Sequence, residues 1–137
     1  MAMRQHPISS FKSKGLTQSL FFAFEGLRSV LKTERNFRTH ILMAISVTCA
    51  GFFFQISTLE WVLLILCMTL MMAVEVLNTA IEVLADAFSE GQYSEHSKRV
   101  KDISAGACLL IASGVAIAGT LIFLPYLLAF LNIPETN

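Results

Sequence analysis

Acidic and amide side chains recur along one short apolar segment, VEVLNTAIEVLAD at residues 74–86. An α-helix turns by about 100° per residue, so side chains spaced three or four residues apart share one face. This spacing places four polar side chains in a single stripe: Glu75, Asn78, Glu82 and Asp86. Charged groups are costly at the edge of a bilayer and usually functional there, so the stripe is the first candidate site.

Glu75 and Glu82 would be about 10 Å apart along such a helix, which is too far to hold one ion together. We therefore expect them to have separate roles. A partly desolvated carboxyl at Glu75 suits a general base that accepts a proton from a lipid alcohol. Glu82 lies nearer the aqueous side and suits a hard cation such as Mg²⁺, which prefers oxygen ligands.

Two other segments contain charges that could complete such a site. Glu34 supplies a second carboxylate in TERNFRTH, residues 33–40. Lys101, in KRVKDISAG, could neutralise phosphate charge, which is the main need of phosphoryl transfer. Three plainer readings stay open: the carboxylates could form a proton or ion path, Glu34 and Lys101 could be solvated interface charges, and Asn78 could simply join helices.

The elements that must position these residues are strongly apolar. Hydrophobic residues make up 55% of the 137-residue chain and charged residues 15%, whereas soluble domains contain about 25% charged residues. Three segments are long enough to cross a bilayer, at about residues 40–57, 59–85 and 103–131. Residues 16–33 have an apolar stripe at helical spacing, which is typical of a helix in the membrane interface. The sequence predicts an all-α membrane protein with one surface helix and three transmembrane helices.

The basic residues predict the topology. Lys and Arg occur only before the first span or between the second and third, so the N-terminus and residues 87–102, expected to be a loop, face the cytosol and the C-terminus lies outside. Residues 16–134 are expected to form one membrane domain between a flexible segment, residues 1–15, and a short tail, residues 135–137. Zero net charge gives no indication of a nucleic-acid partner, and no soluble-type nucleotide motif such as GxxxxGK[ST] is present.

The longer pattern resembles a known family. Glu-x-x-Asn-[Ser/Thr]-Ala-Ile-Glu-x-x-x-Asp at residues 75–86, followed by Lys101-Asp102 and the run SAGA, is similar to the prokaryotic diacylglycerol kinases. ERNFRTH at 34–40 and FEGLR at 24–28 resemble the same family, in the same order. The resemblance implies an integral membrane kinase of the bacterial inner membrane that moves the γ-phosphoryl group of MgATP to a lipid hydroxyl. It also implies a homotrimer whose active sites combine neighbouring subunits.

When residue roles are carried over by position, the resemblance implies that Glu75 is the general base. It also implies that Glu34 and Glu82 hold the metal on ATP. The implied nucleotide site contains these two metal ligands and four further residues: Asp86, Tyr93, Lys101 and Asp102. The implied lipid site contains Phe37, Arg38, Glu75 and Asn78. Many relatives have His directly after the loop Tyr, whereas Ser94 follows Tyr93 here. His40, at the end of ERNFRTH, resembles the undecaprenol-kinase branch more than the diacylglycerol-kinase branch, so undecaprenol is the favoured acceptor.

Overall fold

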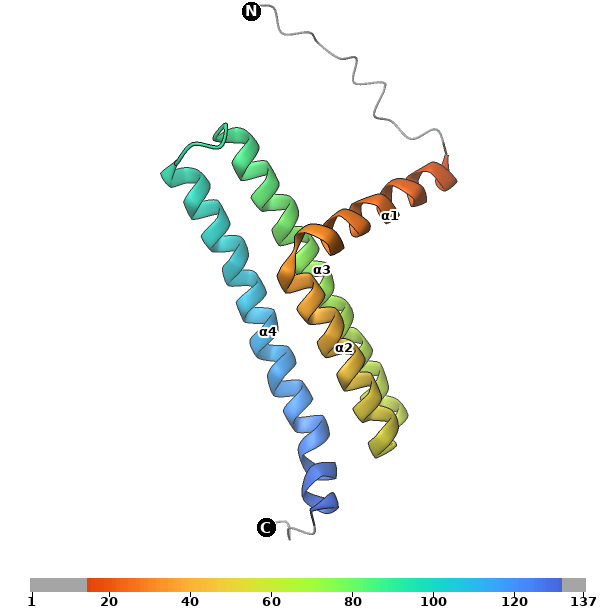
Figure 1. The fold of residues 1–137 in the computed structure, drawn as a ribbon. Helices are drawn as coiled ribbons and strands as arrows, with labels where there is room; N and C mark the ends of the chain where they lie inside the picture. Colours follow the sequence, from red (N-terminus) through yellow and green to blue (C-terminus); the bar gives the residue numbers. More distant parts are fainter. Residues whose placement is uncertain (1–14, 132–137) are drawn as a thin grey trace, which may run out of the picture.

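Four α-helices and no strand make up residues 15–131, which are the residues that the computed structural model describes. The helices are α1 (Leu16–Thr33), α2 (Arg35–Phe54), α3 (Thr58–Phe88) and α4 (Glu95–Phe130), as Figure 1 shows. This arrangement confirms the predicted all-α fold. The predicted end segments fall largely on residues 1–14 and 132–137, which lie outside the described residues.

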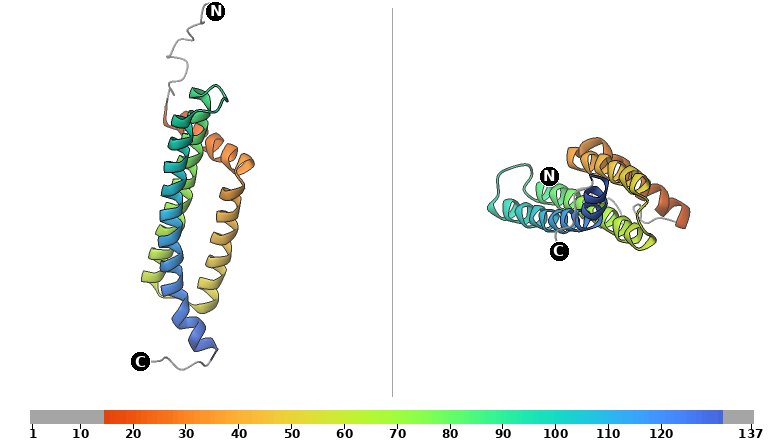
Figure 2. Two further views of the ribbon diagram at one scale, coloured as in Figure 1. Left: turned by 90° about the vertical axis from the view of Figure 1, so that its left-hand side faces the viewer. Right: turned by 90° about the horizontal axis from the view of Figure 1, so that it is seen from below.

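The long helices α3 and α4 run antiparallel and lie side by side along most of their length (Figures 1 and 2). α2 packs mainly on α3, and α1 crosses the bundle at a steep angle near the start of α2. The α1–α2 corner and the α3–α4 turn are therefore directed towards the same end of the bundle. The last turns of α4 bend away from the line of the helix near Pro125, which has no backbone N–H to donate (Figure 2).

The corner between α1 and α2 is made by one extended residue, Glu34, with φ −93° and ψ 115°. The last carbonyl groups of a helix lack intrahelical partners. Here Arg38 Nη1 donates to the carbonyl oxygens of Leu31 at 3.2 Å and Lys32 at 2.9 Å. Arg38 thereby fixes the end of α1 against the first turn of α2.

The connection between α2 and α3 is only three residues long. Gln55 adopts a left-handed conformation, with φ 53° and ψ 46°, and ends α2. The N–H groups of Gln55 and Ile56 donate back to Phe52 and Gly51, as in a Schellman motif. Ser57 and Glu60 then form a capping box that starts α3, so the chain reverses direction without a long loop.

The turn between α3 and α4 is shorter than the predicted loop. Ser94 caps α4 by accepting from the N–H of Ser97, and the Ser97 hydroxyl donates to the Ala85 carbonyl oxygen of α3 at 3.2 Å. These bonds start α4 at Glu95, and α3 continues to Phe88, so the expected loop over 87–102 is wrong for residues 87–88 and 95–102. Hydropathy marks only where apolar residues begin, whereas the helix begins at its polar cap.

Three helices, α2, α3 and α4, are long and apolar enough to cross a membrane. The predicted second and third spans fall almost entirely within α3 and α4. The predicted first span, 40–57, differs from α2, which begins at Arg35 and ends at Phe54. Its end was misplaced because the left-handed Gln55 is not apparent from composition.

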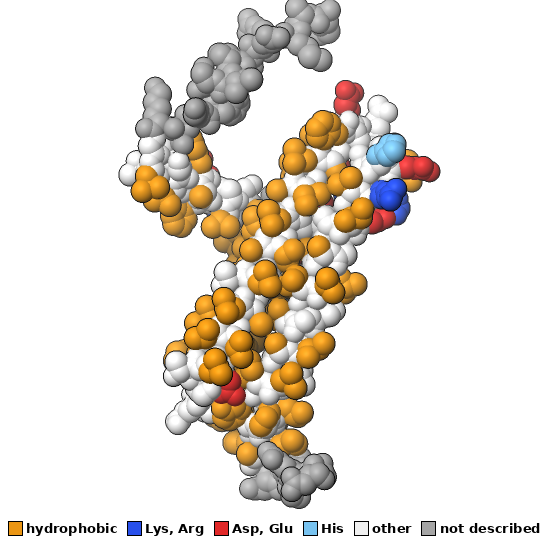
Figure 3. Space-filling view, turned by 180° about the vertical axis from the view of Figure 1, so that it is seen from behind, with side chains coloured by type: hydrophobic (Ala, Val, Ile, Leu, Met, Phe, Trp, Pro, Cys, Tyr) orange, Lys and Arg blue, Asp and Glu red, His pale blue; other side chains and the backbone are white. Residues whose placement is uncertain are grey.

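Few apolar side chains are buried within the single chain. One cluster, around Ile56, Leu64 and Ile122, joins α4 to the ends of α2 and α3 that meet at their short connection. Elsewhere hydrophobic side chains cover the surface of the bundle, and charged side chains of both signs gather at the end with the α3–α4 turn (Figure 3). A hydrocarbon solvent or neighbouring chains would cover such a surface. Most apolar residues of α1, including Leu16 and Phe24, are also exposed, whereas Val30 is buried.

Candidate active site

The polar stripe on α3 faces α4, and its burial decreases towards the α3–α4 turn. Glu75 is only 4% exposed, which makes it one of the two buried polar side chains among residues 15–131. Asn78 and Glu82 are half-buried, and Asp86 is exposed. The four side chains thus follow one path from the interior of the helix pair to its exposed end.

Hydrogen bonds connect the middle of this stripe to α4. Asn78 Nδ2 donates to Glu82 Oε1 at 2.9 Å, one turn further along α3. The Ser104 hydroxyl of α4 donates to Asn78 Oδ1 at 2.6 Å. Both ends of the amide are therefore bonded, one to a carboxylate and the other to the neighbouring helix.

Charged side chains occupy the exposed end of the stripe. Lys101 Nζ of α4 donates to Asp86 Oδ1 of α3 at 2.5 Å, and Lys98 pairs with Asp102 within α4. Tyr93 lies in the adjacent turn and is 79% exposed. Exposed ion pairs stabilise a fold only slightly, so phosphate or metal contacts could replace these pairs at little cost.

One weakly polar group of α4, the Cys108 thiol, lies beside the Glu75 side chain. The Cys108 thiol of α4 interacts with the Glu75 side chain and donates to the Val74 carbonyl oxygen at 3.8 Å. The Thr79 hydroxyl donates to the Glu75 backbone carbonyl at 3.1 Å. A carboxylate in this position can accept a proton from a substrate hydroxyl that reaches it.

The residues predicted near α1 form a separate group at the α1–α2 corner. Glu34 is half-buried and accepts a hydrogen bond from the Thr33 hydroxyl at 2.8 Å. Phe37 is buried, and the Arg38 guanidinium caps α1 as described above. The hydrogen bonds of Glu34 and Arg38 stay within the corner, whereas those of the α3 stripe reach α4.

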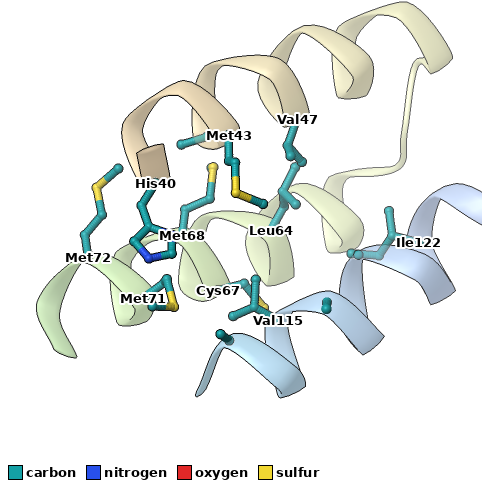
Figure 4. A pocket seen from close by; sticks show the side chains of 14 residues that line it. His40, Met43, Val47, Leu64, Cys67, Met68, Met71, Met72, Val115 and Ile122 are labelled. Carbon is teal, nitrogen blue, oxygen red and sulfur yellow. The ribbon is translucent and has the colours of Figure 1, made fainter. Parts of the chain in front are cut away.

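An apolar cavity of about 210 Å³ lies between α2, α3 and α4 (Figure 4). Methionine, aliphatic and small side chains make up most of its lining, and His40 of α2 adds an imidazole near the start of that helix. Met71 and Met72 belong to the lining on α3. Met71 precedes Glu75 by one helical turn, so the cavity approaches the buried carboxyl.

The carboxylates fit a metal ion only with help from other donors. Within residues 15–131, no group of three or more His, Cys, Asp or Glu side chains could hold a metal ion. Glu82 and Glu34 each have Oε1 engaged by a neighbour, Asn78 and Thr33 respectively. Mg²⁺ commonly takes one or two carboxylate ligands and completes its shell with phosphate and water oxygens. The residues present fit a magnesium ion that arrives with a nucleotide.

Two residues that contact the stripe were given no role in the site by the sequence, although Ser104 begins the quoted run SAGA. Ser104 bonds to Asn78, and Cys108 lies beside Glu75. Both belong to a run of small and apolar residues that composition alone marks as helix packing. The spacing of Lys101, Ser104 and Cys108 by three and four residues places them on one face of a helix, which is the signal that could have identified them.

Known proteins are similar in sequence to this chain over most of its length. The family model for prokaryotic diacylglycerol kinase matches residues 21–123. An undecaprenol kinase of Bacillus subtilis (strain 168) is 37% identical over 110 residues, which are 80% of this chain and 89% of that protein. A diacylglycerol kinase of Synechocystis sp. is 34% identical over 116 residues, covering 85% of this chain and 66% of that protein. A diacylglycerol kinase of Escherichia coli (strain K12) is 35% identical over 92 residues, covering 65% and 72%.

The matched region contains every residue that the sequence predicts for the site, from Glu34 to Asp102. It also spans most of the described chain, from α1 to α4. The chain belongs to the prokaryotic diacylglycerol kinase family, and is an enzyme of this family of membrane lipid kinases.

Proposed function

We propose that this chain transfers the γ-phosphoryl group of MgATP to the hydroxyl of a membrane lipid alcohol, with Glu75 as the general base. The observation that supports this proposal is the stripe on α3, which begins with a buried carboxylate and ends with exposed charged groups. A lipid hydroxyl comes from the membrane and a nucleotide from water, so the site must span both environments.

The residues of the stripe and the charged residues near it have separate roles in the proposed reaction. Glu75 accepts the proton of the lipid hydroxyl while the hydroxyl oxygen attacks the γ-phosphorus. ADP leaves with the electrons of the broken P–O bond. Glu82 and Glu34 would hold Mg²⁺, which would supply positive charge to neutralise the phosphates when bound. The nucleotide is held at the exposed end by Asp86, Tyr93, Lys101 and Asp102. Phe37, Arg38 and Asn78 help to place the acceptor.

Undecaprenol is the acceptor that we favour over diacylglycerol. The undecaprenol kinase of Bacillus subtilis is 37% identical to this chain over 110 residues. The apolar cavity beside α3 suits the hydrocarbon chains of either acceptor, with the hydroxyl lying towards Glu75, so it does not by itself distinguish the two lipids. His40, in the cavity lining, is the residue whose identity favours the undecaprenol branch.

We further propose a homotrimer in the bacterial inner membrane with the N-terminus in the cytosol. Lys98, Arg99 and Lys101, which follow the α3–α4 turn, support this orientation by the positive-inside rule. Exposed apolar faces on all three long helices support contacts with other copies. A neighbouring copy would bring its α1–α2 corner, with Glu34, close to Glu82.

The experiment that tests this function is an acceptor competition. Detergent-solubilised protein receives γ-labelled ATP, Mg²⁺ and equal amounts of undecaprenol and diacylglycerol, and the products are resolved by mass. We expect labelled undecaprenyl phosphate in excess, and no product when Mg²⁺ is chelated. A preference for diacylglycerol would overturn the acceptor assignment alone. Label in neither lipid, from protein that binds ATP, would overturn the kinase proposal.

A further inference from the structure

Ser104 is the second buried polar side chain among residues 15–131, at 7% exposure, and the proposed reaction gives it no role. It lies on α4, within the helix pair that forms the candidate site. Burying a hydroxyl is costly unless it is hydrogen-bonded, so its partners indicate what it contributes. Its hydroxyl lies 2.6 Å from Asn78 Oδ1 and 3.0 Å from the Lys101 carbonyl oxygen. A hydroxyl has one proton, and the shorter contact is to Asn78.

The Asn78 amide has different chemistry at its two ends. Its Nδ2 only donates and its Oδ1 only accepts. Glu82 Oε1 can accept from Nδ2 but would repel Oδ1, while the Ser104 hydroxyl supplies a donor for Oδ1. Only one orientation of the amide therefore satisfies both neighbours. Without the Ser104 hydroxyl, the amide would keep one bond and lose the contact that joins it to α4.

We propose that Ser104 is a positioning residue for the metal-holding carboxylate: it fixes the Asn78 amide, and the amide in turn orients Glu82. This inference rests on the proposed role of Glu82 in holding Mg²⁺ on ATP. The effect of Ser104 passes through Asn78, so Ser104 itself touches neither metal nor nucleotide.

The position of Ser104 on α4 is a second reason to assign it this positioning role. Lys101, one turn earlier on the same face, pairs with Asp86 of α3. The turn from Lys101 to Ser104 thus holds α3 at two points, one on each side of Glu82 along the stripe. A carboxylate held in this way reaches the metal in one orientation, which lowers the entropy lost when MgATP binds.

The test compares Ser104→Ala with Ser104→Thr, which keeps the hydroxyl, and with the matched control Ser113→Ala. Ser113 lies on the same helix, is exposed, and bonds only to its own helix at Leu109 in the described structure. We expect Ser104→Ala to raise KM for MgATP and the Kd of a non-hydrolysable ATP analogue by about three- to tenfold, since one neutral hydrogen bond is lost. The change in kcat should be smaller, and Ser104→Thr and Ser113→Ala should stay near wild type.

The inference is overturned if Ser104→Ala binds the analogue as wild type does, or if Ser104→Thr is as weak as Ser104→Ala. If Ser104→Ala fails to fold, Ser104→Cys keeps a side chain of similar shape but has only a weak S–H donor, and gives the same comparison. Glu82→Gln is measured in parallel. Weak binding by Glu82→Gln with normal binding by Ser104→Ala rejects only the positioning role. Normal binding by both rejects the proposed metal role of Glu82.

Discussion

The two ends of α3 each place a carboxylate against α4, in different surroundings. Near the start of α3, Glu60 Oε2 accepts from the Tyr126 hydroxyl and from the Ser57 N–H, both at 2.7 Å. Towards the other end, Glu82 accepts from Asn78, whose amide continues to Ser104. Both carboxylates are bonded, so bonding alone does not distinguish a structural acid from a functional one.

The residues around Glu60 and Glu82 distinguish the structural acid from the functional one. Glu60 belongs to a helix cap, and Tyr126 belongs to a group of aromatic rings that includes Phe54. The hydrogen bonds of Glu60 therefore cap the start of α3 and join α3 to α4. Glu82 lies between the buried Glu75 and the exposed Asp86, in a continuous series of polar groups that serves no helix end. A carboxylate on a membrane helix is thus a site candidate when other polar side chains continue from it.

The strongest test of this comparison exchanges one carboxyl for an amide at each place. Glu75→Gln keeps the size of the side chain but cannot accept the hydroxyl proton. We expect kcat to fall by about 10²- to 10⁴-fold, the usual contribution of a general base, while ATP binding is largely kept. Glu60→Gln, the matched control, should keep most of its turnover, because its bonds are structural.

Turnover is measured as labelled lipid phosphate, and binding with a non-hydrolysable ATP analogue. Glu75→Gln with wild-type turnover would refute the base assignment. A loss of turnover in folded Glu60→Gln as large as that in Glu75→Gln would refute the contrast between the two ends of α3.

The next largest effect is expected at Glu82. Glu82→Gln removes the charge that we propose holds Mg²⁺, so we expect MgATP to bind at least about tenfold more weakly, with a smaller change in kcat at saturation. Glu95→Gln is the control, because Glu95 is an exposed acid in the first turn of α4. Titration with a MgATP analogue measures both. Equal affinities in the two variants would show that Glu82 does not hold the metal.

The sequence predicts the helices and the polar stripe on α3 well, but it predicts the contacts between the helices poorly. Periodicity over residues 74–86 places the polar stripe on one face, and three long apolar runs identify the spans. Periodicity cannot tell which neighbour that face meets, because this depends on how α3 and α4 pack. Ser104 and Cys108 therefore became apparent only in the structure. The start of α4 at Glu95 and the capping of α1 by Arg38 depend on local hydrogen bonds that hydropathy does not contain.

The opposite end of the bundle should respond in stability and not in turnover. Gly51 is buried, and a Cβ atom there would lie 2.8 Å from Trp61 Cη2. Trp61 is half-buried, and its ring lies 4.8 Å from that of Phe52 at a tilt of 50°, so an added Cβ would force the indole to shift. Gly51→Ala should lower the free energy of unfolding by about 1–3 kcal/mol, as overpacking usually does.

Denaturation in detergent measures that loss. Gly114→Ala is the control, because a Cβ at Gly114 meets no atom of the described chain within 4 Å. Alanine is also favoured over glycine inside a helix, so Gly114→Ala should not destabilise the chain. A loss of stability in Gly114→Ala as large as that in Gly51→Ala would exclude contact with Trp61 as the cause.

The smallest effect is expected at the Tyr126 hydroxyl. Tyr126→Phe keeps the ring in its aromatic surroundings and removes only the hydrogen bond to Glu60. Glu60 would keep its bonds to Ser57, so α3 stays capped and the loss of stability should be smaller than for Gly51→Ala. Turnover should be unchanged, because the stripe lies at the other end of α3. A Tyr126→Phe variant that unfolds like wild type but loses turnover would mean that this bond acts on the site, and the separation of the two ends would fail.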